Sequence, residues 1–222
     1  MRKLKDFITG LFWLILSICI AAAIVVNSTF IYKKYISYFN LEKETSLTAT
    51  EILSDYEKII SYINNPKLDK IQFEYFTLSK NGMSHFKDVK NIFQFIYLFI
   101  ILSLLLITVL YLINMFKKKK TKLASFNYFF YCSIALVCSL IIFTLWDFNT
   151  LFKLFHSIAF TNDYWIFDVV DDSIINVLPK DYFLLCLILI FAIVLVQSIS
   201  CKIVYLLKNR DSRKTCNNKL SN

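Results

Sequence analysis

The chain is poor in the residues that many enzyme motifs require. Its 222 residues include only two glycines, two prolines and two histidines. Two isolated glycines cannot form a GxSxG nucleophile elbow, a phosphate-binding loop or a GxGxxG motif. The HExxH motif is missing, and two histidines with a lone carboxylate would make a poor zinc site. We therefore expect no nucleotide chemistry, no metal and no other cofactor.

Charged residues are missing from four long apolar stretches, apart from Lys202, whose ammonium can extend to the membrane surface. A helix needs about 20 apolar residues to cross a membrane, and four such stretches in one short chain are not typical of a soluble domain. We interpret the first stretch as a retained anchor rather than a cleaved signal peptide, because it is long and lacks a clear cleavage site. The predicted spans are residues 7–29, 92–116, 126–146 and 183–207.

Cysteine is missing from the connections predicted to lie outside the membrane. Five of the six cysteines lie in the apolar stretches, and Cys216 lies in the C-terminal tail. No CxxC pair and no Cys/His metal spacing occurs. An extracellular disulfide is therefore not expected.

Basic residues are placed unevenly along the chain. The N-terminal tail, the connection 117–125 and the chain from Lys202 onward contain 14 of the 25 basic residues, but only two acidic ones. Basic segments stay on the cytoplasmic side, so both termini and the loop 117–125 are predicted to be cytoplasmic. The connections 31–91 and 147–182 then form an extracytoplasmic cap. The net charge of +9 indicates topology and contact with membrane lipids rather than nucleic-acid binding.

The first outer connection contains helix and strand patterns. Residues 48–64 predict a helix, because Thr48 and Glu51 form a capping box and apolar residues recur at helical spacing. Residues 69–78 alternate between apolar and polar, which predicts a strand, and residues 80–82 predict a turn. The fold class is therefore an all-α membrane protein, with four transmembrane helices and a small α+β extracytoplasmic cap. Tyr32, Tyr35 and Tyr38 are interpreted as interfacial belt residues.

Both histidines are predicted to lie at the outer membrane surface. Ser84 is a plausible N-cap for a helix that continues into the second span, which places His85 on its first turn with Asp88 on the same face. In the second connection, residues 148–160 have the apolar stripe of a helix lying in the membrane interface, with His156 at its edge. Pro179 is a natural start for the last helix. A histidine pair in one layer favours proton transfer, although each histidine can also be a simple interfacial residue.

Two stretches resemble a known family. "MSHFKDVK" (83–90) and "LFHSIAFTNDYWIFDVVDDSIINVLPKDYF" (154–183) are similar to the two signature regions of the bacterial lipoprotein intramolecular transacylases. The resemblance implies that His85 and His156 are catalytic. It implies that diacylglyceryl-modified lipoproteins are the substrates, at the outer face of the bacterial cytoplasmic membrane. The sn-2 acyl chain would move to the α-amino group of the N-terminal cysteine, which gives the lyso-form lipoprotein.

The residues suit this reaction. An α-amino group has a pKa of about 7.7–8.0, so it needs a base before it attacks an ester, and the alkoxide leaving group needs a proton. Two imidazoles can divide these tasks, and no acyl-enzyme intermediate is then required. The sequence does not distinguish base from acid. Our working assignment makes His85 the base with Asp88 as its orienting group, and makes His156 the group that protonates or polarises the ester.

Other residues near His156 are candidates for substrate binding. Asn162 can donate to an oxyanion or form a turn, and the loop aspartates can bind the amine or simply cap the loop. The aromatic residues can line a pocket, belong to an interfacial belt, or do both. These candidates are Asn162, Asp163, Asp168, Asp171, Phe160, Tyr164 and Trp165.

Two other functions are compatible with the sequence. One is a non-catalytic membrane protein whose outer cap binds a partner. The other is a histidine-dependent lipid acyl hydrolase that uses water in place of the amine. The lipid product distinguishes all three, because only the transacylase retains the number of acyl chains on the lipoprotein.

Overall fold

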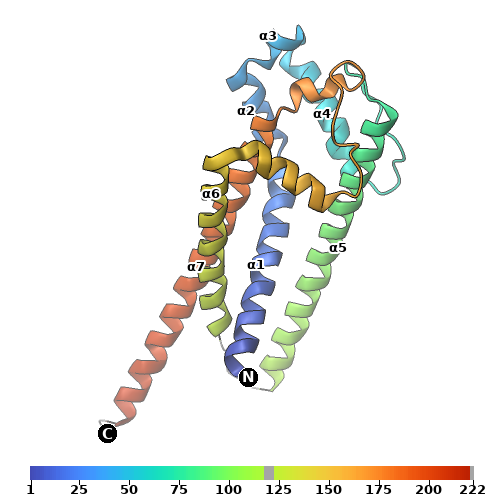
Figure 1. Ribbon diagram of the computed structural model, residues 1–222. Coiled ribbons are helices and arrows are strands. Elements are labelled where there is room, and N and C mark those ends of the chain that lie inside the picture. The colour runs from blue at the N-terminus through green and yellow to red at the C-terminus, as the bar shows by residue number, and fades with distance from the viewer. Residues whose placement is uncertain (118–122, 221–222) are drawn as a thin grey trace. The chain divides into compact units, whose positions relative to one another are not determined.

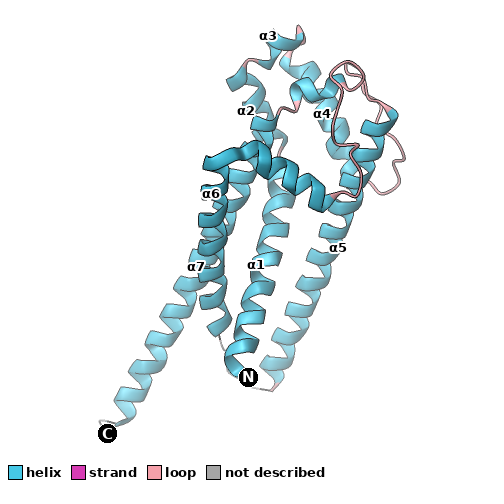
Figure 2. Ribbon diagram, in the orientation of Figure 1, coloured by secondary structure: helices cyan, strands magenta, loops and turns pink. Residues whose placement is uncertain are grey.

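The computed structural model describes residues 1–117 and 123–220, with side chains as far as Arg210. All regular secondary structure within these residues is helical (Figure 2). Most of the predicted cytoplasmic loop 117–125 lies outside the described residues. The elements are α1 (Arg2–Val26), α2 (Thr29–Phe39), α3 (Leu41–Thr45), α4 (Ala49–Asn64), α5 (Lys80–Phe116), α6 (Ala124–Ala159), the 3-10 helix η1 (Ser173–Val177) and α7 (Lys180–Leu220).

Four of these helices, α1, α5, α6 and α7, are long and apolar enough to cross a membrane. The chain divides into two compact units, which we describe separately. The first unit contains residues 1–21, 100–142 and 190–222, and the second contains residues 22–99 and 143–189. Both histidines belong to the second unit.

The first unit has a small apolar core made by α1, α6 and α7. Leu14, Phe129 and Val194 are buried there. Gly10 allows α1 to approach α6 closely, because a Cβ atom at this position would lie 2.7 Å from the Cβ of Tyr128. The hydroxyl of Ser17 donates to the side chain of Gln197, so these two polar groups of α1 and α7 satisfy each other.

The second unit is built around the buried face of α4. The predicted capping box is present, and the predicted apolar stripe of this helix is buried. The hydroxyl of Tyr56 donates to the carbonyl of Val26 (3.1 Å) and lies 2.8 Å from the hydroxyl of Tyr182. Tyr32 and Tyr35 are also buried in this core, so their interpretation as belt residues was wrong. Tyr38, at 80% exposure, is the member of that set that faces outward.

The strand predicted for residues 69–78 is absent, so the prediction of an α+β cap was wrong. The segment is irregular because a buried carboxylate takes the place of a neighbouring strand. The backbone N–H groups of Glu74, Tyr75 and Phe76 donate to Asp55, over distances of 2.9 to 3.2 Å. Backbone N–H groups must be satisfied wherever they are buried, and a carboxylate can accept several at once. The described cap therefore consists of helices joined by irregular segments.

Helix α5 begins at Lys80, where a turn was predicted. The N-cap is Ser79 rather than Ser84, because the hydroxyl of Ser79 accepts the N–H of Gly82 (3.0 Å). Ser84 lies inside the helix, where its hydroxyl donates to the carbonyl of Lys80 (3.0 Å). The prediction of an unbroken helix into the second apolar stretch is confirmed. His85 therefore lies in the second turn, before that stretch begins.

Helix α6 changes direction at Asp147 (Figure 1), where the backbone is extended, with φ −160° and ψ 99°. The carboxylate of Asp147 accepts the N–H of Asn149 (2.9 Å) and the hydroxyl of Thr150 (2.5 Å), so it caps a second helical half. Along this half His156 is buried, whereas Leu154, Phe155 and Ile158 are exposed. The kink therefore separates the apolar stretch 126–146 from the histidine.

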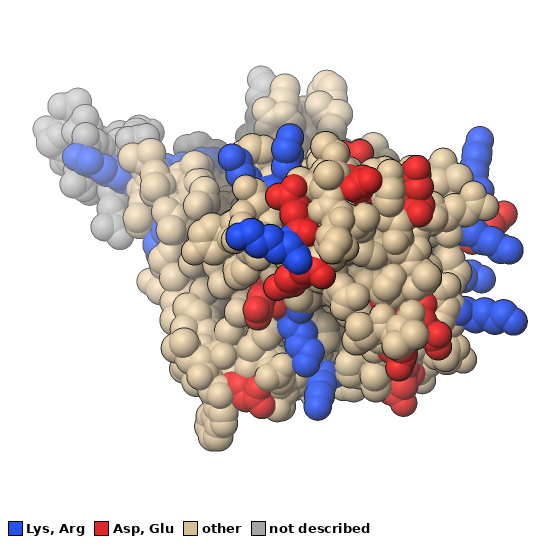
Figure 3. Space-filling model, turned by 90° about the horizontal axis from the view of Figure 1, so that it is seen from above, with Lys and Arg blue, Asp and Glu red and all other residues tan. Residues whose placement is uncertain are grey.

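Acidic and basic side chains are interspersed over the described face shown in Figure 3. This mixture agrees with the near balance of 14 acidic and 11 basic residues in connections 31–91 and 147–182. It contrasts with the strongly basic tails and loop 117–125.

We predict that Asp55→Asn destabilises the second unit by about 1–3 kcal/mol, because an amide nitrogen replaces one acceptor and leaves partly buried N–H groups unpaired. Burial alone raises the pKa of Asp55, but its hydrogen bonds to Lys58, Glu74 and Tyr75 outweigh burial and hold the pKa below its ordinary value. Stability from this site should therefore be present above about pH 4 and be lost below it. Thermal unfolding in detergent micelles measures both effects. Glu57→Gln, an exposed residue of the same helix, is the matched control, and an equal loss in both variants would contradict the prediction.

Candidate active site

The start of α5 is tied to the segment that follows α6 by the buried carboxylate of Asp172. Asp172 accepts the backbone N–H of Ser79 (2.7 Å) and its hydroxyl (3.0 Å). Gly82 leaves room for this contact, because a Cβ atom there would lie 2.3 Å from Oδ1 of Asp172. The side chain of Asp172, 90 positions further along the chain, thus explains why position 82 is a glycine. Its effect is to fix the helical turn just before His85.

A second link joins the same two segments one turn beyond His85. The side-chain amide of Asn162 donates to Asp88 (3.0 Å), and the carbonyl oxygen of that amide accepts the N–H of Tyr164 (3.1 Å). Asn162 therefore holds the loop after α6 against α5. The amide N–H that donates to Asp88 is not available to an oxyanion, which was one of the two roles considered for Asn162 from the sequence. Within the described part of the chain, the carboxylate of Asp88 accepts a hydrogen bond from Asn162 rather than from His85.

The two histidines lie side by side. Their ring centroids are 6.1 Å apart, the ring planes differ by 35°, and each residue is only 9% exposed. His85 comes from the second turn of α5 and His156 from the last turn of α6. The structure thus brings together the two histidines on which the sequence argument depends.

Aromatic rings enclose the histidine pair. Phe160 lies 4.7 Å from the ring of His85 and 5.6 Å from that of His156, between ring centroids. Trp165 lies 4.6 Å from the ring of His156. Two further rings were not singled out from the sequence: Phe152 packs on His156 (4.2 Å) and Phe167 on His85 (5.5 Å). The helical spacing of four residues between 152 and 156 was the signal for Phe152, whereas no sequence pattern marked Phe167.

The hydrogen bonding of His156 defines its tautomer. Its Nδ1 lies 2.7 Å from the carbonyl oxygen of Phe152. A carbonyl only accepts, so Nδ1 carries the proton, and in the neutral ring Nε2 presents a lone pair. Burial lowers the pKa of His156, an effect that the bond to Phe152 opposes. The neutral ring with a free Nε2 is the form that can accept a proton.

His85 is also held neutral. Burial is the main cause, and His156 adds to it, so the pKa of His85 falls to about 4 although Asp88 acts in the opposite direction. Both imidazoles are therefore uncharged near pH 7. Two cations side by side in an apolar enclosure would be costly, so we expect at most one of the two rings to become an imidazolium at a time.

Two buried polar atoms of the site have no hydrogen-bond partner among the described residues: Nδ1 of His85 and Nε1 of Trp165. A buried polar group without a partner costs about 1–3 kcal/mol, so such groups are rare away from functional sites. Both belong to the same aromatic enclosure. Their position indicates that a polar ligand completes this site.

The loop aspartates are placed differently from one another. Asp163 and Asp171 are exposed. Asp168 caps its own loop, accepting the N–H of Val170 (2.8 Å) and of Asp171 (3.3 Å). The buried aspartate is Asp172, which sequence reasoning missed because nothing distinguishes it from its neighbour in the pair 171–172. Among the described residues, no group of histidine, cysteine and acidic side chains is arranged to hold a metal ion.

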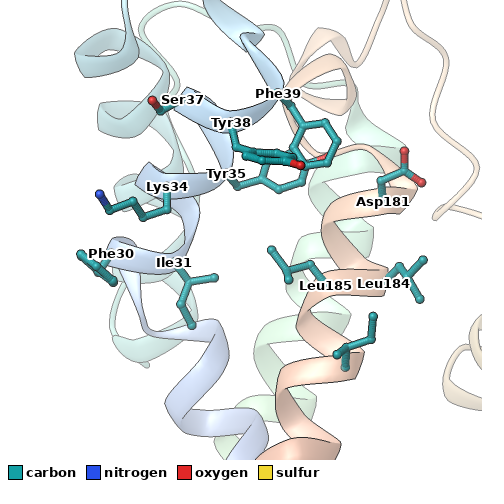
Figure 4. A pocket seen from close by; sticks show the side chains of 11 residues that line it. Phe30, Ile31, Lys34, Tyr35, Ser37, Tyr38, Phe39, Asp181, Leu184 and Leu185 are labelled. Atoms are coloured by element: carbon teal, nitrogen blue, oxygen red, sulfur yellow. The ribbon is translucent and has the colours of Figure 1, made fainter.

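The second unit also has a wide groove of about 970 Å³ between α2 and α7 (Figure 4). Lys34 and Asp181 lie on its opposite sides, and the rings of Tyr35, Tyr38 and Phe39 gather near one end. Neither histidine lines this groove. The candidate active site is therefore the aromatic enclosure of the histidines, not this groove.

The comparisons with known proteins agree with this geometry. The model of the family described as lipoprotein intramolecular transacylase Lit matches residues 7–183. The chain belongs to this family. A comparison with curated proteins gave no match.

Solved structures of a relative support the assignment. The integral membrane transacylase Lit from Bacillus cereus is 26% identical, with a TM-score of 0.83, over 95% of this chain and 97% of that one. The same protein with an H85R mutation is 27% identical, with a TM-score of 0.75, over 95% and 93%. With an H85A mutation the values are 27% and 0.75, over 95% and 94%. The protein described here is thus a membrane-integral transacylase, an acyltransferase of lipoproteins.

We predict that Gly82→Ala lowers the stability of the transacylase by about 1–3 kcal/mol, because the new methyl group overlaps the Asp172 carboxylate that Ser79 holds in place. The displaced helix start should also reduce acyl transfer. Asn81→Ala, an exposed neighbour in the same turn, is the control. Equal melting temperatures for the two variants would contradict the close contact between Gly82 and the Asp172 carboxylate.

The depressed pKa of His85 predicts a pH-dependent stability. Between about pH 6.5 and pH 4 an unfolded histidine binds a proton and the folded one does not, so stability should fall as the pH is lowered through this window. His85→Phe should remove about 1–3 kcal/mol of that loss. Thermal unfolding in micelles at pH 7 and pH 4.5 measures the difference. Identical pH dependence in both proteins would contradict a neutral, buried His85.

Proposed function

We propose that this transacylase moves the sn-2 acyl chain of a diacylglyceryl-modified lipoprotein to the α-amino group of its N-terminal cysteine. The product is an N-acylated lyso-form lipoprotein. The observation that carries the proposal is the pair of neutral imidazoles, 6.1 Å apart, inside an aromatic enclosure where two polar atoms have no partner among the described residues. Family membership supplies the reaction class.

His156 is the better candidate for the base. The ammonium group first loses one proton to water, and the bond from Nδ1–H of His156 to Phe152 leaves Nε2 free to take a second proton from the amine as it attacks. This reverses our working assignment, in which His85 was the base and Asp88 its orienting group. We propose that Asp88 acts on the site through Asn162, which donates to its carboxylate.

The proton taken by His156 returns to the substrate. Once the amine has attacked the ester carbonyl, the tetrahedral intermediate expels the glyceryl oxygen as an alkoxide, which the imidazolium protonates. His85 is neutral, and its Nδ1 has no partner in the described part of the chain, so we propose that it hydrogen-bonds the glyceryl group. The amine and the ester belong to one flexible molecule. Because the enclosure would hold the two groups in contact, it supplies a large effective molarity. No nucleophile of the protein is used.

We place the enzyme in the bacterial cytoplasmic membrane, with the active site at the outer leaflet. The spans 7–29, 92–116, 126–146 and 183–207 would leave both termini and the loop 117–125 in the cytoplasm. The segments 31–91 and 147–182 would form the extracytoplasmic cap that contains both histidines. Basic cytoplasmic residues would contact anionic membrane lipids.

His85→Ala and His156→Ala are each expected to abolish N-acylation, because one removes a hydrogen-bonding imidazole and the other the base. Mass spectrometry of a lipoprotein N-terminal peptide, from bacteria expressing each variant, identifies the acyl chain on the amine and counts the chains that remain. Lys87→Ala, an exposed neighbour of His85, is the control.

The lipid products separate the competing functions. Loss of one acyl chain with release of free fatty acid would indicate a hydrolase. An unchanged lipid pattern in both histidine variants, with protein present in the membrane, would indicate a non-catalytic role. Either result would overturn the proposed transfer.

A further inference from the structure

Trp165 contributes an N–H group that the fold does not use. Its Nε1 is buried and has no partner among the described residues. The indole ring packs on His156, with ring centroids 4.6 Å apart and planes 32° apart. Phenylalanine would provide an aromatic ring for this packing without burying an unpaired donor. The N–H group therefore points to an acceptor that belongs to the substrate.

The reaction itself creates such an acceptor. When an amine attacks an ester, the carbonyl oxygen becomes an oxyanion, which requires a hydrogen-bond donor held in advance. Other side-chain donors near the pair are used elsewhere: the Asn162 amide donates to Asp88, Nδ1–H of His156 donates to Phe152, and His85 is proposed to bond the glyceryl group. Nε2 of His156 carries the lone pair that accepts the amine proton. The indole N–H of Trp165 remains available beside the reacting groups.

We propose that Trp165 is a catalytic residue whose Nε1–H donates a hydrogen bond to the carbonyl oxygen of the ester undergoing transfer. The amine nitrogen forms a bond to the carbonyl carbon, and the carbonyl π pair moves to the oxygen that faces the indole N–H. His156 takes the amine proton. When the pair returns, the bond to the glyceryl oxygen breaks and that oxygen takes the proton from His156. This assignment rests on the proposed function and deepens it by naming the oxyanion donor.

The experiment removes the N–H while it keeps the ring. Trp165 is replaced by phenylalanine, and separately by benzothienylalanine, in which sulfur takes the place of the N–H in a bicyclic ring of the same shape. Single-turnover rates and KM are measured in micelles with a synthetic diacylglyceryl lipopeptide, with mass spectrometry of the product. Trp146→Phe is the matched control, because Trp146 is 86% exposed.

Both Trp165 replacements are expected to lower the rate of transfer by about 100- to 1000-fold with little change in KM, since the oxyanion develops only in the transition state. The Trp146→Phe control should retain full activity. If benzothienylalanine preserves the rate, the ring shape alone matters and the proposal is wrong. A rise in KM without a fall in rate would also overturn it, because the N–H would then act only in ground-state binding.

Failure of this inference differs from failure of the proposed function. If both Trp165 variants transfer at full rate while His156→Ala is inactive, only the role of Trp165 is lost. If His156→Ala itself still transfers the acyl chain, the proposed histidine chemistry is lost.

Discussion

The geometry of the site depends on one buried carboxylate, that of Asp172. It caps the start of α5 through Ser79 and occupies the space that Gly82 leaves open. Because Asp172 belongs to the segment after α6, this contact connects the two parts of the chain that carry the histidines. Asn162 and Asp88 make the second connection on the other side of His85. Two imidazoles from distant segments can face each other only if both segments are held in this way.

The sequence predicted the elements that are determined locally. Long apolar runs and the Thr48–Glu51 capping box correctly indicated helices, since both signals act within a few residues. The strand at 69–78 was wrong because its N–H groups are satisfied by Asp55, a partner far away in sequence. The burial of Tyr32 and of Asp172 was missed for the same reason. Tertiary contacts decide such residues, and local patterns do not record them.

The candidate site could be located from the sequence but not arranged. The scarcity of histidine pointed to His85 and His156, and the aromatic residues around position 160 were candidates to line a pocket or to form an interfacial belt. The tautomer of His156, the Asp88–Asn162 bond and the unpartnered indole N–H all depend on distances that no spacing rule provides. The protein retains buried polar groups here that a core selected only for stability would pair or remove. Such exceptions are common at functional sites.

The break in α6 at Asp147 has an electrostatic consequence for His156. It gives residues 148–159 a helix of their own, whose last turn contains His156 and closes with the Phe160 N–H to His156 carbonyl bond (2.9 Å). The peptide dipoles of a helix leave a partial negative charge at its carboxyl end, which stabilises a cation there. A transient imidazolium at this end is therefore partly compensated by the backbone itself. The buried ring can thus gain a proton during the reaction although it stays neutral at rest.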